Sequence, residues 1–179
     1  MRGDVGARVR LLAARDAECA RFGADTHRYA LRPPLPEAEI RRFEAAHGIA
    51  LPPAYRAFVA EAGDGPAGPG HGLMPLTEPR AGVDDDWAVD AEWREDRQPG
   101  RLATPFALTE PLRGPLRALP ESLTPGTLTL SELGCGTYDR LVLTGPHAGE
   151  IWHLDPDWAG FVPRHADFRS WYEEWLNAV

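Results

Sequence analysis

The first quarter of the chain carries apolar residues at helical spacing, which predicts two helices separated by a linker. Residues 4–22 are expected to form the first helix, on an apolar stripe that Asp16 interrupts and that consists of Val5, Val9, Leu12, Cys19 and Phe22. Residues 24–35 are expected to be an irregular linker that ends in two prolines. The second helix is predicted from about Pro36, since proline is tolerated in a first helical turn, to Gly48.

A third helix with a single apolar face is followed by a run rich in glycine and proline. The helix is predicted to begin at Pro52 or Pro53, with an apolar face made of Tyr55, Phe58, Val59 and Ala62. Gly63 then stands where a left-handed helix cap is usual. A P-loop precedes a helix and needs a lysine, whereas this run follows a helix in a chain without lysine. We therefore interpret residues 63–82 as a loop that leads the chain onto a sheet.

Alternation of apolar and polar residues predicts strands only in the last third of the chain. Strands are expected at residues 126–131, which read GTLTLS, and at 137–144, 149–154 and 160–163. Because their connections are short, the strands should pair antiparallel. Residues 84–97 match neither the helical nor the strand repeat well enough to be assigned. A short helix and a turn are both compatible with them. Residues 98–125 are expected to form an ordered loop with short extended pieces.

The C-terminal segment shows the clearest amphipathic pattern in the chain. A helix over about residues 166–178 brings one apolar set onto a single face: Phe168, Trp171, Tyr172, Trp175 and Leu176. N-terminal helices followed by a late, mostly antiparallel sheet and a closing helix predict an α+β fold, with the C-terminal helix packed on the sheet. We expect residues 1–35 to be an N-terminal helix and linker extension and residues 36–179 to be the main domain, in one compact unit.

The charge balance restricts the partners that the chain can have. All 19 basic residues are arginine, and 27 acidic residues give a formal net charge of −8. Such acidity disfavours nucleic acid and anionic membranes as partners and is compatible with a basic protein. Two cysteines make no disulfide framework, and we find neither a signal peptide nor a run of 18 apolar residues. We therefore expect a cytoplasmic protein.

Acidic residues and tryptophan are concentrated in residues 84–97, which read DDDWAVDAEWREDR. Between Asp84 and Asp96 there are seven acids and one arginine, a local net charge of −6 that would steer a basic partner. Tryptophan in a loop often covers the edge of a core, but it is also enriched at binding hot spots. The residues that we expect to contact a partner are Asp84, Asp85, Asp86, Trp87, Asp90, Trp93, Asp139 and Trp158.

Two sets of residues could carry chemistry, and each has a simpler structural interpretation. Cys135 and His147 could form a catalytic pair only in a geometry that sequence does not show, and cysteine is commonly a small apolar residue. Asp139, Glu150 and Asp155 could supply a carboxylate pair for hydrolysis, as any acidic sheet could. Acidic runs could bind a cation, but a solvated loop explains them, and HExxH and CxxC motifs are absent. We expect no metal, cofactor or catalytic residue.

Four stretches in order make the chain similar to the SUKH superfamily of the Smi/Knr type. They are FEAAHGIALPPAYRAFVAEAGDG at 43–65, GPGHGLMPL at 68–76, LGCGTYDRLVLTGPHAGEIWHLD at 133–155 and FRSWYEEWL at 168–176. FGADTHRYAL at 22–31 also resembles bacterial members, so the similarity spans roughly residues 20–177. One departure is His71, where an aromatic residue, often tyrosine, is expected.

The resemblance implies an α+β domain without catalysis. Bacterial members are described as immunity proteins that bind and neutralise toxins, often nucleases, and fungal relatives as interaction and regulatory proteins. We therefore expect a non-catalytic, protein-binding immunity protein with a cognate toxin as its partner. A regulatory or scaffold module with an endogenous protein partner is the alternative, and a carboxylate-dependent hydrolase is a third hypothesis.

Overall fold

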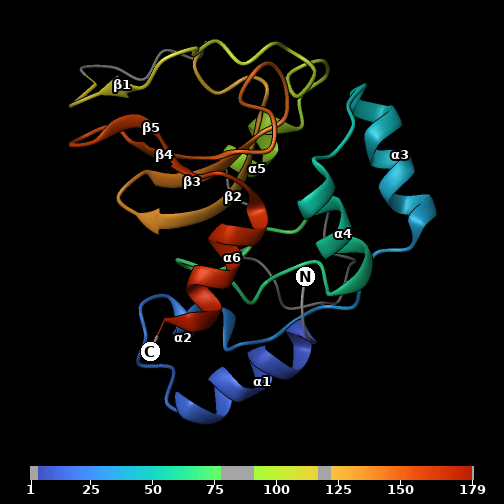
Figure 1. Cartoon of the computed structure of the whole chain (residues 1–179), viewed down its shortest axis with the longest axis vertical. Helices are drawn as coiled ribbons and strands as arrows, with labels where there is room; N and C mark the ends of the chain where they lie inside the picture. Colours follow the sequence, from blue (N-terminus) through green and yellow to red (C-terminus); the bar gives the residue numbers. More distant parts are fainter. Residues whose placement is uncertain (1–3, 78–90, 117–121, 179) are drawn as a thin grey trace.

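A five-stranded antiparallel sheet occupies the upper left of the molecule as seen in Figure 1. The structure is a computed structural model that describes residues 4–77, 91–116 and 122–178. The strands are β1 (Leu112–Arg113), β2 (Thr127–Gly134), β3 (Thr137–Val142), β4 (Ile151–Asp155) and β5 (Gly160–His165). Their spatial order is β1-β5-β4-β3-β2, and every neighbouring pair is antiparallel. The predicted late antiparallel sheet is confirmed, and β1 is an extended piece of the long loop.

The helices found in the described residues are α1 (Val5–Arg15), α2 (Ala24–His27), α3 (Glu37–His47), α4 (Pro53–Glu61), α5 (Ala91–Asp96) and α6 (Phe168–Asn177). Helices α3 and α4 lie where the apolar periodicity predicts them, and Gly48 ends α3 in the left-handed conformation at φ 65°. Helix α5 occupies part of the segment that has no clear period in the sequence. The α+β prediction is confirmed. In the described residues, no helix combines the length and apolar character needed to cross a bilayer.

Both faces of the sheet carry buried apolar residues, since alternate residues of each strand point to opposite faces. On one face the cross-strand neighbours Leu128, Leu141 and Ile151 join a large apolar cluster with residues of α1, α3, α4 and α6. On the other face a smaller cluster consists of Phe106, Leu123, Val142, Trp152, Leu154 and Phe161. An ionisable side chain in the middle of either face must therefore find its partners inside the protein.

Helix α6 covers the larger cluster and begins with a reciprocal cap. The carboxylate of Asp167 accepts a hydrogen bond from the backbone N of Ser170 at 2.7 Å, and the Ser170 hydroxyl accepts one from the backbone N of Asp167 at 3.4 Å. The predicted apolar face is buried at Phe168, Trp171, Tyr172 and Leu176, with Trp175 partly buried. The predicted C-terminal helix and its packing against the sheet are confirmed.

The N-terminal helix is shorter than the sequence pattern predicts. Helix α1 ends at Arg15, because the Asp16 carboxylate accepts hydrogen bonds from the backbone N of Ala20 at 2.8 Å and of Arg21 at 3.2 Å. A side chain that satisfies these amides itself stabilises a turn in place of further helix. Buried residues of α1 belong to the same apolar cluster as α6, so the N-terminal extension shares the core of the main domain.

The run rich in glycine and proline covers the outer edge of strand β2. The backbone N of His71 donates to the carbonyl of Glu132 at 2.9 Å, and that of Met74 donates to Leu130 at 2.7 Å. The hydroxyl of Ser131 donates to the carbonyl of Pro69 at 2.6 Å. An exposed edge strand can pair with other chains, so this loop satisfies hydrogen-bonding groups that would otherwise be open to them. The glycines serve the fold, as expected.

Close backbone approach explains two of these glycines. A Cβ on Gly70, which has φ +62°, would lie 2.4 Å from the carbonyl oxygen of Glu132. Gly63 was predicted to be a left-handed helix cap, and that prediction is wrong, because its φ is not positive. A Cβ there would lie 2.5 Å from the carbonyl oxygen of Arg32, so the linker before α3 requires glycine at this position.

Substituting Gly70 tests the packing of the loop on β2. Gly70→Ala should lower the free energy of unfolding by more than Gly100→Ala, since both positions have positive φ but nothing lies within 4 Å of a Cβ on Gly100. Strain alone costs about 1 kcal/mol, and the overlap at Gly70 adds to it. Urea unfolding of both variants measures the difference. Equal losses would show that the loop moves away from β2 without cost.

A buried histidine gives the fold a pH dependence. His27, at the end of α2, is 2% exposed, and its Nδ1 accepts a hydrogen bond from the backbone N of Tyr29 at 3.0 Å. Burial, together with the nearby Arg21, lowers the pKa of His27 to about 4. Asp16 and Asp25 oppose this shift without reversing it. His27 is therefore neutral in the folded protein at pH values where it is protonated in the unfolded chain.

Stability should fall as the pH is lowered from about 6.5 towards 4, because the unfolded chain binds a proton there that the folded protein does not. The loss assigned to His27 between pH 7 and pH 5 is roughly 2 kcal/mol. His27→Gln removes this titration, so its unfolding free energy should change less over the same range, whatever its absolute stability. Parallel curves for the two proteins would contradict the assignment.

Candidate binding surface

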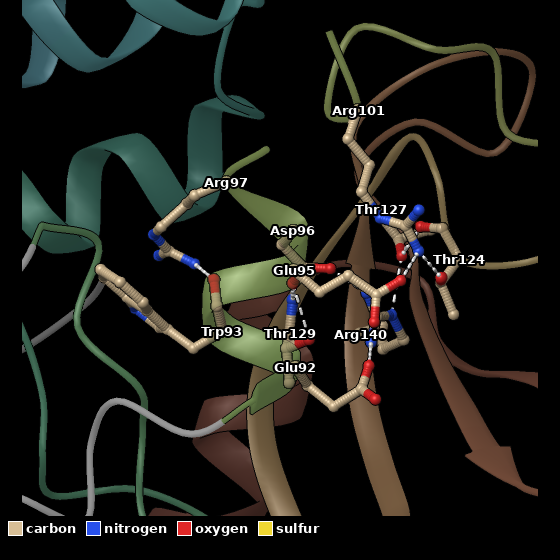
Figure 2. Close-up of polar contacts among 10 residues, drawn as sticks. All are labelled: Glu92, Trp93, Glu95, Asp96, Arg97, Arg101, Thr124, Thr127, Thr129 and Arg140. Atoms are coloured by element: carbon tan, nitrogen blue, oxygen red, sulfur yellow. Dashed lines mark hydrogen bonds and ion pairs between the residues drawn. The ribbon is translucent and has the colours of Figure 1, made fainter. Parts of the chain in front are cut away.

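Arg140 places a positive charge inside the molecule. It lies on β3, fully buried, on the face of the sheet that carries the smaller apolar cluster. Its guanidinium forms ion pairs with Asp96 and Glu92 of α5, the latter at 3.1 Å between Nη1 and Oε2. Its Nε donates to the hydroxyl of Thr127 at 2.8 Å. Figure 2 shows these side chains converging between α5 and the sheet.

Helix α5 is held on the sheet by its carboxylates. Asp96 Oδ2 accepts hydrogen bonds from the backbone N and the hydroxyl of Thr129, each at 2.6 Å. Glu95 forms an ion pair with Arg101, whose Nη2 also donates to the Thr124 hydroxyl at 2.6 Å. A helix of six residues is too short to be stable by itself, so these contacts determine where α5 lies.

These ion pairs reduce the charge that the acidic segment offers to a partner. The acids of this segment that lie in the described residues are all paired within the molecule: Glu92 and Asp96 with Arg140, and Glu95 with Arg101. The local net charge of −6 counted from the sequence therefore overstates the charge that is available. Five predicted contact residues, Asp84, Asp85, Asp86, Trp87 and Asp90, lie outside the described residues.

Trp93 belongs to the interior and not to an exposed surface. It is 6% exposed, and its indole Nε1 donates to the carbonyl of Pro75 at 2.7 Å. The guanidinium of Arg97 lies 3.7 Å from the centre of the indole ring and donates to the carbonyls of Pro75 and Leu76. The expectation that Trp93 lies on the contact surface is corrected. Trp93 and Arg97 instead join the chain just before residues 78–90 to the chain just after them.

Asp139 also lies in the interior. Its carboxylate is fully buried and accepts hydrogen bonds from the indole of Trp171 at 2.7 Å and from Arg164 at 3.0 and 3.1 Å. His153 Nδ1 lies 2.8 Å from the same group. A buried carboxylate with these partners cannot contact another protein, so the expectation for Asp139 is corrected. It joins α6 and β5 to the middle of the sheet.

The strand geometry keeps Cys135 apart from His147, and Glu150 apart from Asp155. Cys135 lies in the β2–β3 turn and His147 between β3 and β4, at opposite ends of the six-residue strand β3, about 20 Å apart. Glu150 precedes β4 and Asp155 ends it, a separation of about 16 Å along the strand, which is beyond the reach of a carboxylate pair.

Glu150 instead binds local groups. Its Oε2 lies 3.1 Å from Nδ1 of His147 and accepts a hydrogen bond from the indole of Trp152 at 2.9 Å. Glu150, together with the carbonyl of Thr109, raises the pKa of His147. Two grooves of about 870 Å³ each, one beside α1 and α4 and one beside α3 and α5, are lined by none of the residues proposed for hydrolysis. In the described residues, no group of three His, Cys, Asp or Glu side chains could hold a metal ion.

Trp158 is exposed, as the prediction of a contact residue requires. It is 81% exposed in the turn between β4 and β5. Asp155 Oδ1 accepts hydrogen bonds from the backbone N of Asp157 at 3.1 Å and of Trp158 at 3.0 Å, which fixes the turn. The carbonyls of Pro156 and Ala159 accept hydrogen bonds from the segment that follows β1. Trp158 is thus an exposed aromatic side chain on an ordered backbone.

Sequence reasoning did not find the role of Arg140. The only available signal was an arginine in a predicted strand between buried neighbours. The alternation of a strand shows which face of the sheet such a residue is on. Whether that face is interior depends on the element that covers it. The acidic helix that covers it comes from a segment without a clear period, so this ion-pair cluster was not predicted.

The cluster around Arg140 can be tested by a pair of substitutions. Arg140→Met should destabilise the fold by about 3–5 kcal/mol, because it leaves Asp96 charged and buried. Adding Asp96→Asn should recover part of the loss, since asparagine can still accept from Thr129 and carries no charge. In the otherwise unchanged protein Asp96→Asn should be destabilising. Chemical unfolding of the three variants measures the coupling.

The exposed pair of Arg41 and Glu37 supplies the control. The side chain of Arg41 is 74% exposed, so Arg41→Met should change the unfolding free energy by less than about 1 kcal/mol. Additive effects of Arg140→Met and Asp96→Asn would mean that the two side chains are not coupled.

Comparison with known proteins agrees with this architecture. The family model described as the SMI1 / KNR4 family (SUKH-1) matches residues 34–174, most of the chain. The match begins in the linker before α3 and extends into α6, so it includes the whole sheet and α5. No curated protein and no solved structure matches the chain at the significance required. The chain belongs to the SMI1 / KNR4 (SUKH-1) family.

Proposed function

We propose that this protein is an immunity protein, which binds a toxin with a basic surface and blocks its activity without catalysing a reaction. Membership of the SUKH-1 family is consistent with a protein-binding role. The observation that carries the proposal is Trp158, an 81% exposed tryptophan on a turn fixed by Asp155. A large aromatic side chain held in place before binding loses little entropy when a partner buries it.

The charge of the chain favours a basic partner. The net charge is −8, and we propose that Asp84, Asp85, Asp86 and Asp90, with Trp87 among them, also meet the toxin. Charges at the rim of an interface mainly raise the association rate, whereas buried anchors slow dissociation. A nuclease fits this description, because its active site binds a phosphate backbone and presents basic residues. Acidic side chains would occupy that region in place of nucleic acid.

We place this activity in the cytoplasm. The free cysteines Cys19 and Cys135 are compatible with a reducing compartment. We do not propose hydrolysis, because the carboxylate of Asp139 is engaged by three side chains and Glu150 and Asp155 stand at opposite ends of β4.

The first partner to test is the protein encoded by the gene immediately upstream. The chain should bind it and suppress its toxicity when the two are co-expressed. Trp158→Ala should weaken binding by about 30-fold, a loss of about 2 kcal/mol, because the side chain supplies buried area at the contact. Replacing Asp84, Asp85 and Asp86 with asparagine should slow association on the order of tenfold at low salt and little at high salt.

Leu11 provides the matched control, as an apolar side chain of α1 that is 51% exposed. Leu11→Ala should leave both rate constants unchanged, and all variants should unfold like the parent protein. Binding without loss of toxicity would favour a regulatory or scaffold role over immunity. If Trp158→Ala bound the toxin and suppressed its toxicity as well as the parent protein does, Trp158 would not be part of the interface.

A further inference from the structure

One end of the sheet gathers the exposed aromatic side chains of the described residues. In an antiparallel sheet consecutive turns alternate between the two ends, so the β2–β3 turn with Cys135 and the β4–β5 turn with Trp158 share one end. Both turns lie at the left of Figure 1. We call this region the turn end of the sheet and define it by Phe22, His71, Glu132, Cys135, Asp157 and Trp158.

Phe22 reaches the turn end through the loop that covers β2. Its ring lies 5.0 Å from the ring of His71, between centroids, and Phe22 is 65% exposed. His71 Nδ1 lies 3.3 Å from the hydroxyl of Thr26, and its backbone N donates to Glu132 on β2. A Cβ on the next residue, Gly23, would lie 1.9 Å from the carbonyl oxygen of Gly70. The position of Phe22 is therefore determined by tight backbone packing.

The two aromatic side chains of the turn end lie several strands apart. The turn with Trp158 lies two to three strands away from β2, or about 10–15 Å at the usual strand spacing. Phe22 extends this width on the far side of β2. Two exposed aromatic side chains on fixed backbone are thus separated by the half-exposed ends of the strands.

Charged groups of both signs lie on and beside this surface. Asp157 is exposed and Glu132 is partly exposed, while Asp155 lies beneath the turn. Two exposed arginines lie close by. Arg113 of β1 is in register with Gly160 of β5, next to the turn, and Arg28 is at the end of α2. Aromatic faces beside carboxylates bind guanidinium groups well, since the ring attracts the cation and the carboxylate pairs with it.

From this arrangement we infer that the turn end of the sheet binds arginine side chains on the surface of a basic protein partner. Phe22 and Trp158 stack on the guanidinium groups, and Glu132 and Asp157 pair with them. His71 positions Phe22 and is not itself a contact. A second copy of this chain is disfavoured as the occupant, because each copy carries a net charge of −8. This inference rests on the proposed protein-binding function and adds the second anchor and the chemistry of the ligand.

A labelled oligoarginine peptide is the probe, with oligolysine and oligoglutamate for comparison. Fluorescence anisotropy should show binding in the order oligoarginine, oligolysine, oligoglutamate. Phe22→Ala and Trp158→Ala should each weaken oligoarginine binding about fivefold, the size of an exposed cation–π contact of about 1 kcal/mol. Leu11→Ala is the control and should change the affinity by less than about twofold.

Cys135 reports the location of the bound peptide. In a Cys19→Ser background Cys135 is the only thiol, and it lies exposed between the two anchors. Oligoarginine should slow its alkylation, and at a subsaturating peptide concentration the slowing should be smaller in Trp158→Ala. An unchanged alkylation rate in the presence of saturating peptide would overturn the assignment of the turn end.

A further variant separates this surface from the acidic segment. If replacing Asp84, Asp85 and Asp86 with asparagine abolishes oligoarginine binding while Phe22→Ala and Trp158→Ala have no effect, the inference is wrong. The proposed function would then still stand, with the acidic segment as its contact. If the chain binds oligoarginine at the turn end but no toxin, the inference holds and the immunity proposal fails.

Discussion

A guanidinium group inside an apolar sheet must be paired, and the pairing of Arg140 determines much of this structure. Its partners Asp96 and Glu92 come from a helix too short to be stable without them. That helix also carries Trp93, which is bonded to the carbonyl of Pro75. Through α5, the buried charge of Arg140 on β3 thereby joins the sheet to the chain on both sides of residues 78–90.

The opposite face of the sheet follows the same rule with the charges reversed. There the carboxylate of Asp139 is buried, and its donors come from α6, β4 and β5. On each face, therefore, a fully buried ionisable side chain links the sheet to a covering element. Such pairs contribute little net stability compared with apolar packing, but removing one partner leaves a buried charge. They specify how the covering elements are placed, which is what a binding surface built from separate loops requires.

Only side chains that are not used in these internal ion pairs and hydrogen bonds are available to a partner. Three carboxylates of the acidic run, those of Glu92, Glu95 and Asp96, are used in internal ion pairs. The exposed aromatic residues are found elsewhere, at the turn end of the sheet, where Phe22 and Trp158 stand on tightly packed backbone. A protein that acts by binding can use such fixed anchors directly, because no rearrangement is needed before contact.

By itself, the sequence determined the elements that have strong local signals. The α+β class, helices α3, α4 and α6, the late antiparallel sheet and the family follow from periodicity, proline and glycine placement and four ordered motifs, since these reflect short-range geometry. The tertiary structure decided which polar and aromatic residues are buried. Trp93 and Asp139 are interior and Trp158 is exposed, although all three stand among acidic or polar neighbours in the chain. Burial depends on which distant segment covers a residue, and a local pattern contains no information about that segment.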